Sequence, residues 1–319
     1  GKRFRALMAH VGYALSSGTD IEEVSLPHLS AALELYQASA LVHDDIIDKA
    51  DERRGMPTPH RTLADYHAAQ SWIGSSTDFG RHSAILVGDF LFSAATAAAD
   101  EQALTLREDC VRAFSRRFAD MHAEVALGQY LDITAEQAPL DPERTDALNM
   151  SDSLEVALHK SAHYSVVHPA LLGAICAAPS FDHVADLLDV LETILTPWGL
   201  AFQLRDDDLG VFGDPAVTGK PAGDDLREGK RTALLALTWE ASSPAERRAL
   251  TDVLGVAEAS AEQIATATEI VERNGRAAHE AEIARLVADG DAALEASNFD
   301  EDARAMLREL CSILTARRA

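Results

Sequence analysis

The segment Gln37-Ala38-Ser39-Ala40-Leu41-Val42-His43-Asp44-Asp45-Ile46-Ile47-Asp48 decides how this chain is interpreted. It predicts a helix, and at 100° per residue Gln37, Asp44 and Asp48 lie on one face of it, within about 40° of one another around the helix axis. Two carboxylates one turn apart on an otherwise apolar helix repel each other, and burying them unpaired is costly. Mg²⁺ prefers oxygen ligands and is usually held by one or two carboxylates plus substrate phosphates. Taken alone, the segment fits either a Mg²⁺ site or a solvated acidic helix end.

The sequence beyond this helix favours the metal site. Arg53-Arg54-Gly55 follows it, and two adjacent guanidinium groups suit a phosphate group because they bind phosphate oxygens bidentately. A second acidic cluster, Asp206-Asp207-Asp208, occurs far downstream and leads into a long break rich in glycine and proline. Long breaks of this kind tend to be binding loops or lids. The two acidic clusters therefore predict a site that binds Mg²⁺ and phosphate together.

The distribution of lysine supports this prediction. The chain has 28 Lys+Arg residues against 52 Asp+Glu, and its net charge of −24 argues against nucleic acid and anionic lipid as partners. Most of the few lysines nevertheless lie in short basic patches between and beside the acidic clusters. The lysines are Lys2, Lys49, Lys160, Lys220 and Lys230. All but Lys49 fall in these patches, and together with the arginines they can converge on a diphosphate bridged by several Mg²⁺ ions.

The rest of the chain predicts an all-α protein. Apolar residues recur at three- and four-residue spacing, and 47% of the 319 residues are hydrophobic. Ser243-Pro244-Ala245-Glu246 predicts a capping box, residues 261–274 predict a helix, and an apolar stripe including Ile313 predicts the last one. No linker is visible, so we expect a single domain over residues 1–319.

The location is predicted to be cytoplasmic, without stable membrane insertion. The longest apolar stretch, 169–179, is shorter than the roughly 20 residues that a membrane helix needs. No signal peptide is visible. The three cysteines, Cys110, Cys176 and Cys311, are far apart, which argues against a disulfide framework or a zinc site and fits a reducing compartment.

In the order and spacing of these motifs, over nearly its whole length, the chain resembles the trans-prenyltransferases, or polyprenyl diphosphate synthases. The resemblance implies one large bundle of ten or more helices around a deep central cavity, and a homodimer. It implies Mg²⁺ dependence, with about three ions when substrate is bound. The implied substrates are isopentenyl diphosphate and an allylic diphosphate, which can be dimethylallyl, geranyl or farnesyl diphosphate.

The resemblance also implies roles for individual residues. Magnesium ligands or their supporting carboxylates would be Asp44, Asp45, Asp48, Asp206, Asp207 and Asp225. The allylic diphosphate would be bound by Arg53, Lys160, Lys220 and Lys230. The diphosphate of isopentenyl diphosphate would be bound by Lys2, Arg5, Gln37 and Arg54. Ser161 and Gln203 would face the reacting carbons and, with the Lys160 carbonyl, stabilise the allylic cation.

Two positions depart from the family pattern. Gly210 stands where the second acidic motif normally has its last aspartate, and Asp208 could compensate although it points to a different helix face. Ser161 stands where the family usually has threonine, which keeps the hydroxyl group.

Product length is expected to follow cavity depth. Farnesyl-type members tend to carry aromatic residues four and five positions before the first aspartate, where this chain has Ala40 and Ser39. We therefore expect the C20 product geranylgeranyl diphosphate, with Leu91 and Phe92 as candidates for a deeper floor. Ordinary close helix packing is the alternative explanation for the two small residues, and a farnesyl or longer product stays open.

Two other functions compete with chain elongation. A class I terpene cyclase shares a helical bundle and a first aspartate motif, but would lack Arg53-Arg54-Gly55 and the second acidic cluster. A non-catalytic subunit of a heteromeric prenyltransferase would be expected to have lost aspartates from the first motif, which is intact here.

Overall fold

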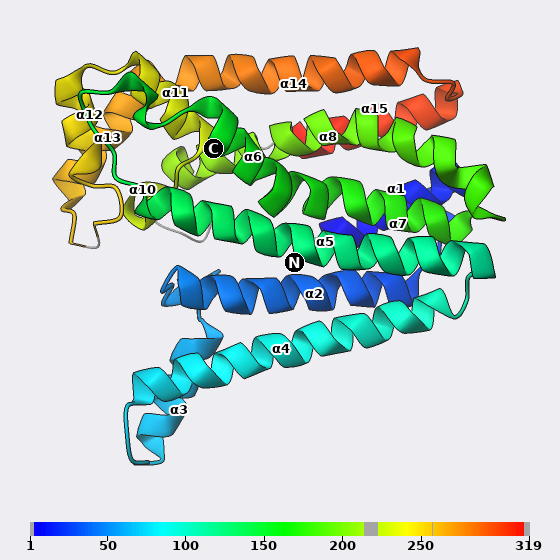
Figure 1. Cartoon of the computed structure of the whole chain (residues 1–319), viewed down its shortest axis with the longest axis horizontal. Coiled ribbons are helices and arrows are strands. Elements are labelled where there is room, and N and C mark those ends of the chain that lie inside the picture. Colours follow the sequence, from blue (N-terminus) through cyan, green and yellow to red (C-terminus); the bar gives the residue numbers. More distant parts are fainter. Residues whose placement is uncertain (1–2, 214–222, 257, 316–319) are drawn as a thin grey trace. The chain divides into compact units, whose positions relative to one another are not determined.

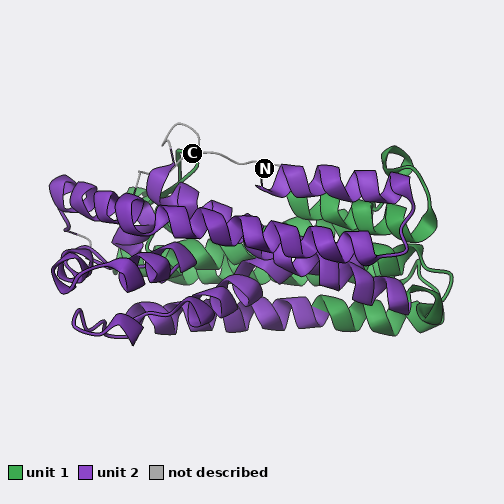
Figure 2. Cartoon of the chain, turned by 90° about the horizontal axis from the view of Figure 1, so that it is seen from above, with its two compact units in different colours: residues 1–118, 172–184 green, residues 119–171, 185–319 purple. Residues whose placement is uncertain are grey.

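Helices make up nearly all of the computed structural model, which describes residues 3–213, 223–256 and 258–315 (Figure 1). The only strands in these ranges are the two-residue β1 (Glu52–Arg53) and β2 (Met56–Pro57). The prediction of an all-α fold with ten or more helices is confirmed. The chain divides into two compact units, residues 1–118 with 172–184, and residues 119–171 with 185–319 (Figure 2). A single domain over 1–319 stays a prediction.

The first unit is built around two long helices, α2 (Pro27–Ile47) and α4 (Ser76–Ala103). Besides these and the two short strands, it contains α1 (Phe4–Ser17), the 3₁₀ turn η1 (Ile21–Glu23) and α3 (Pro59–Ala69). Both α2 and α3 pack along α4 (Figure 1). Close approach of α2 and α4 requires glycine at position 88, because a Cβ there would lie 2.2 Å from the His43 ring. The Ser39 hydroxyl donates a hydrogen bond to the Gly88 carbonyl at 2.8 Å, which joins the two helices.

Three helices contain residues of both units: α5 (Glu108–Gln137), α7 (His168–Ala177) and α8 (Phe181–Phe212). The second unit also contains the 3₁₀ turn η2 (Thr145–Ala147), α6 (Met150–Ala157) and the π-helix η3 (Leu158–Val167). Its later helices are α10 (Asp224–Glu228), α11 (Ala233–Ala241), α12 (Pro244–Thr251), α13 (Ala261–Asn274), α14 (Arg276–Ala296) and α15 (Glu301–Thr315).

The core of the second unit follows the predicted helix patterns. Ser243 and Glu246 form the predicted capping box of α12, and the helix predicted over residues 261–274 is α13. One core cluster gathers around the fully buried Trp239. In α15 the apolar stripe is buried at Leu307, Leu310 and Leu314, but Ile313 is 50% exposed, so its inclusion in that stripe was wrong. The buried stripe is narrower than predicted, because only the side of α15 that carries these leucines packs against the rest of the unit.

Within the described residues, α4 is the one helix long and apolar enough to cross a membrane, judged by length and composition alone. Only 22% of its most apolar window is buried. The exposed apolar side chains include Leu86 and Phe90, at 68% and 73% exposure. Large apolar side chains exposed along one helix often mark an interaction surface.

Candidate active site

The first acidic motif lies at the C-terminal end of α2, in the first unit. The Arg53 guanidinium donates to Asp45 at 2.6 Å and to Asp44 at 3.1 Å. Burial of Asp45 raises the pKa of its carboxyl group, although the neighbouring Arg53 opposes that shift. The predicted helix through Asp48 ends one residue earlier, because Asp48 is the C-cap and Lys49 adopts a positive φ of 56°. The first motif therefore has a cation of its own unit bound across two of its three aspartates.

A tight hairpin brings Arg53 back to this helix end. Arg53 pairs with Met56, which leaves Arg54 and Gly55 as a two-residue loop with φ of 56° and 71°. Two consecutive positive φ angles define the type I′ turn, and glycine at its second position avoids steric strain. Arg54 is exposed at the tip of this turn. The sequence Arg53-Arg54-Gly55 thus directs one guanidinium group to the aspartates and the other to solvent.

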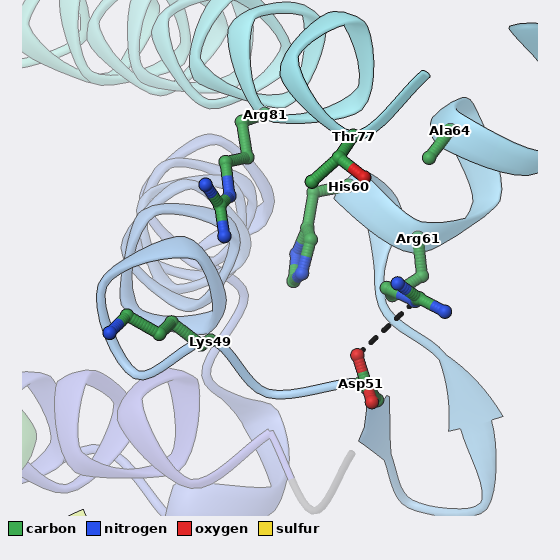
Figure 3. A pocket seen from close by; sticks show the side chains of 7 residues that line it. All are labelled: Lys49, Asp51, His60, Arg61, Ala64, Thr77 and Arg81. Carbon is green, nitrogen blue, oxygen red and sulfur yellow. Dashed lines mark ion pairs between the residues drawn. The ribbon is translucent and has the colours of Figure 1, made fainter. Parts of the chain in front are cut away.

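A small basic recess adjoins the first motif (Figure 3). Its volume is about 140 Å³. Three cationic side chains line it, Lys49, Arg61 and Arg81, and the other lining residues are Asp51, His60, Ala64 and Thr77. The Asp51 carboxylate pairs with Arg61 at 3.2 Å, so the recess keeps a net positive lining. Sequence analysis did not single out this group, because its residues are spread over two helices and a loop.

The second acidic motif lies on α8, in the second unit, and its aspartates have different surroundings. Asp206 is exposed, whereas Asp207 is buried and accepts a hydrogen bond from the Gln203 amide at 2.8 Å. Burial raises the pKa of Asp207 well above its usual value, and the like charges of Asp225 and Asp206 raise it further. A bound divalent cation would relieve this repulsion, and oxygen-rich carboxylate sets are the ligands that Mg²⁺ prefers. The donor set therefore fits Mg²⁺.

Gly210, which stands in place of the last aspartate of this motif, lies beside an acidic residue of another helix. A Cβ at position 210 would lie 2.0 Å from the Asp225 carboxylate, so the glycine leaves room for an acidic group from α10. The buried carboxylate of Asp208, the residue expected to be able to compensate, faces Arg276 at 3.3 Å and Arg205 at 4.0 Å. Arg205 is held in turn by a two-pronged contact with Glu280 of α14. The third carboxylate beside Asp207 thus comes from a separate helix.

Two of the predicted phosphate-binding lysines converge in the second unit. The Lys160 ammonium lies 2.5 Å from the Asp132 carboxylate, and Lys230 lies 3.4 Å from the same group and 2.8 Å from Glu136. Burial of Asp132 would raise its pKa, but the two lysines outweigh this effect and lower it. Sequence analysis assigned no role to Asp132; its place in Gly128-Gln129-Tyr130-Leu131-Asp132, between the acidic clusters, was the available signal.

Gly128 permits the approach of the lysine-bearing segment. A Cβ at this position of α5 would lie 2.4 Å from the Lys160 backbone nitrogen. The π-helix η3 therefore contacts α5 through backbone, and π segments are frequent at functional sites. Ser161 follows Lys160 on this segment and is half-buried.

The remaining predicted residues lie where the helices place them. Arg5 and Gln37 are half-buried on α1 and α2. Leu91 is half-buried on α4, and the Phe92 ring packs edge-on against Tyr36 with centroids 5.9 Å apart. Lys2 and Lys220 lie outside the described residues. The structure thus gathers the first motif with Arg53 in one unit, and the second motif in the other, where Lys160 and Lys230 share Asp132.

Comparison with known proteins decides the family. The polyprenyl synthetase family model matches residues 1–271. The chain belongs to the polyprenyl synthetase family. The geranylfarnesyl diphosphate synthase of Aeropyrum pernix is 33% identical over 86% of this chain and 76% of its own. A geranylgeranyl diphosphate synthase of Mycobacterium tuberculosis is 32% identical over 87% of this chain and 70% of its own.

A solved structure of the family agrees with the fold over the full chain. The geranylgeranyl pyrophosphate synthase of Corynebacterium glutamicum, complexed with isoprenyl diphosphate and magnesium, is 37% identical, with a TM-score of 0.87. It matches 100% of this chain and 87% of its own length. These relatives confirm that this polyprenyl synthetase is a chain-elongating prenyltransferase.

Proposed function

We propose that the chain condenses isopentenyl diphosphate with allylic diphosphates in a Mg²⁺-dependent reaction and releases the C20 product geranylgeranyl diphosphate. The observation that carries the product length is the pair of small residues, Ser39 and Ala40, that precede Asp44 on α2. The geranylgeranyl diphosphate synthases of Corynebacterium glutamicum and Mycobacterium tuberculosis support the same length.

Magnesium would be held by the two aspartate motifs. Asp44 and Asp48 are the proposed ligands at the first motif, and Asp206 is the proposed ligand at the second, supported by Asp207 and Asp225. When bound, Mg²⁺ would neutralise the charge that develops on the leaving diphosphate. Three ions with substrate bound is our proposal for the full complement, on the family resemblance.

The cationic side chains would bind the diphosphates. Arg53, Lys160 and Lys230 are proposed to bind the allylic diphosphate, and each already contacts a carboxylate that helps to fix its position. Lys220 is proposed for the same group. Lys2, Arg5, Gln37 and Arg54 are proposed to bind the diphosphate of isopentenyl diphosphate.

The carbon–carbon bond would form beside polar groups of the second unit. The allylic C–O bond breaks, the double bond of isopentenyl diphosphate attacks the resulting cation, and a proton leaves to the released diphosphate. The Lys160 carbonyl, the Ser161 hydroxyl and the Gln203 amide are proposed to stabilise the cation by their dipoles. Because the Gln203 amide nitrogen donates a hydrogen bond to Asp207, its carbonyl oxygen is proposed to face the positive charge.

One assay tests this function. The chain is incubated with Mg²⁺, isopentenyl diphosphate and each of the C5, C10 and C15 allylic diphosphates, and the products are sized. We expect C20 from every starter. A C25 product would favour the activity named for the Aeropyrum pernix relative, a C15 product would make the chain a farnesyl diphosphate synthase, and no condensation would refute the proposal.

A variant tests whether the small residues set the product length. Ala40 is half-buried, whereas Ser39 is 2% exposed and its hydroxyl donates a hydrogen bond to α4, so close helix packing is the alternative explanation for Ser39. We therefore expect Ala40→Phe alone to shorten the product towards C15. Ala40→Ser is the matched control and should keep C20, and an unchanged product from Ala40→Phe would remove Ala40 from the argument.

We also propose that the enzyme is a cytoplasmic homodimer that uses the exposed apolar face of α4. Leu86 and Phe90 supply this face, and association would remove it from water. Light scattering should give twice the chain mass, and Leu86→Glu with Phe90→Glu should give single chains. Asp65→Lys on the exposed surface of α3 is the control, and a monomeric unmodified chain would contradict the proposal.

A further inference from the structure

Three imidazole rings of the second unit converge on one carboxylate, away from the aspartate motifs in sequence. Glu124 Oε1 lies 2.6 Å from His159 Nδ1 and 2.6 Å from His163 Nδ1. Glu124 Oε2 lies 2.6 Å from His168 Nε2. The two oxygens of a single glutamate therefore face three histidines, a set that the proposed condensation does not use.

The spacing of the histidines explains part of this convergence. His159 and His163 stand four residues apart on η3, a spacing that places two residues on one side of a helix. Their Nδ1 atoms and a Glu124 oxygen all lie within 4.8 Å of one another. Gly128, one turn after Glu124 on α5, lets the two segments approach this closely.

We propose that Glu124, His159 and His163 form a binding site for Zn²⁺ or a similar divalent transition metal ion. Two imidazole nitrogens and one carboxylate oxygen, with a fourth position left for water, make a common zinc ligand set. Mg²⁺ prefers oxygen ligands, so this site is chemically distinct from the aspartate motifs.

The distances require only a small adjustment to admit the ion. Ligand atoms about 2.0–2.1 Å from a tetrahedral zinc ion lie about 3.3 Å from one another. Glu124 Oε1 therefore needs to withdraw by less than about one ångström from each Nδ1 atom, after which those nitrogens direct lone pairs to the metal. All three side chains are partly buried, at 17–26% exposure, so an ion reaches the site from one side.

His168 acts as a positioning residue for this site. Its side chain is 5% exposed, and its Nε2 atom holds the second oxygen of Glu124. Metal-binding groups that are fixed by an outer hydrogen bond bind more tightly, because the ligand orientation is set beforehand. His168 thus aims Oε1 at the two Nδ1 atoms.

Metal at this site would fix the segment that carries Lys160. His159 directly precedes that lysine, and the ion would tie η3 to α5 on the same side as Asp132. Occupancy is therefore expected to raise thermal stability, because any ligand that binds only the folded state does so.

The test measures metal binding on the full chain in excess Mg²⁺. The protein is stripped with a chelator, dialysed against Zn²⁺ and analysed for bound metal, and Co²⁺ is used in parallel because its visible absorption reports tetrahedral imidazole ligation. We expect one Zn²⁺ retained per chain, a tetrahedral Co²⁺ spectrum and a raised melting temperature. An unmodified chain that retains no Zn²⁺ would overturn the proposal, whatever the variants do.

Variants then assign the ligands. His159→Ala with His163→Ala, and separately Glu124→Gln, should abolish retention and the Co²⁺ spectrum, whereas the exposed His183→Ala is a matched control that should keep both. His168→Leu should weaken binding by about 10–100-fold, as loss of an outer partner does. Unchanged Zn²⁺ retention in a folded Glu124→Gln chain, checked by circular dichroism, would refute the site.

Discussion

The two aspartate motifs are similar in sequence but differ in how their negative charge is balanced. At the first motif, Arg53 contacts both Asp44 and Asp45, so a cation of the same unit offsets the burial of Asp45. At the second motif, Asp207 has the neutral Gln203 as its hydrogen-bond partner, and the like charges of three further carboxylates raise its pKa. The buried aspartate of the first motif is thus offset by an arginine, whereas the buried aspartate of the second lies among like charges.

A motif therefore does not define its own surroundings. Asp208 looks interchangeable with its neighbours in sequence, yet its carboxylate contacts Arg276 of α14. Asp225, from a different helix, takes the position over Gly210 instead.

The largest effect should follow loss of a metal ligand at either motif. Asp44→Ala and Asp206→Ala each remove a carboxylate that would hold Mg²⁺, and we expect kcat/KM to fall by roughly 1,000-fold, about 4 kcal/mol. Steady-state kinetics at saturating Mg²⁺ checks this. The exposed Asp65→Ala is the control, and near-normal turnover in Asp44→Ala would defeat the assignment of the first motif.

The stability of the protein should depend on pH through a histidine of α14, the helix that contacts Asp208 of the second motif. The pKa of His279 on α14 is lowered from 6.5 to about 4, mainly by burial. Arg205 and Arg276 also lower this pKa, whereas Glu280 and Glu282 oppose the shift. The unfolded chain therefore takes up a proton as pH falls from 6.5 to 4 while the folded chain does not, and stability falls over this window by about 3 kcal/mol. Above pH 6.5 this penalty is absent.

His279→Leu should remove this part of the pH dependence. The ring is fully buried, and neither ring nitrogen has a hydrogen-bond partner among the described residues, so an apolar replacement loses no such bond. Denaturant unfolding at several pH values should show the variant and the unmodified chain closest at pH 7, and the variant more stable at pH 5. Parallel pH curves for the two would contradict the predicted protonation state.

Neutralising one aspartate in each motif should change stability differently. In a chelator, Asp45→Asn leaves the half-buried Arg53 without its closest carboxylate and should cost about 2 kcal/mol. Asp207→Asn relieves like-charge repulsion, and we expect no loss of stability. Chemical denaturation without metal measures both, and equal losses would show that the two motifs are compensated alike.

The smallest effect concerns the contact between Gly210 and Asp225. Gly210→Ala should displace the Asp225 carboxylate, and Asp225→Ala should remove it, so each should lower activity by about tenfold. Combining them should cost little more than either alone, because both act on one interaction. Fully additive losses in this double-mutant cycle would mean that Asp225 does not act through the space over Gly210.

The sequence predicts local features of this protein better than its long-range contacts. The capping box at Ser243, the helix over residues 261–274 and the all-α class follow from periodicity and capping, which are encoded in neighbouring residues. The end of α2 was misplaced by one residue, because the positive φ of Lys49 has no sequence signature.

Contacts between distant segments escaped prediction for a physical reason. The sharing of Asp132 by Lys160 and Lys230 joins residues 28 and 98 positions apart, and no local pattern encodes such a distance. The grouping of His159 and His163 with Glu124 has the same cause, because the glutamate is 35 and 39 positions away from the two histidines and no local pattern links them.

The central claim is that both aspartate motifs bind magnesium on one diphosphate. A crystal structure of the chain with Mg²⁺ and a non-reactive bisphosphonate tests it most directly. We predict Mg²⁺ ions about 2.0–2.1 Å from carboxylate oxygens of Asp44 and Asp48, and another at the same distance from Asp206, all touching the same ligand. A ligand bound with metal at only one motif, while the other stays remote from it, would contradict the account.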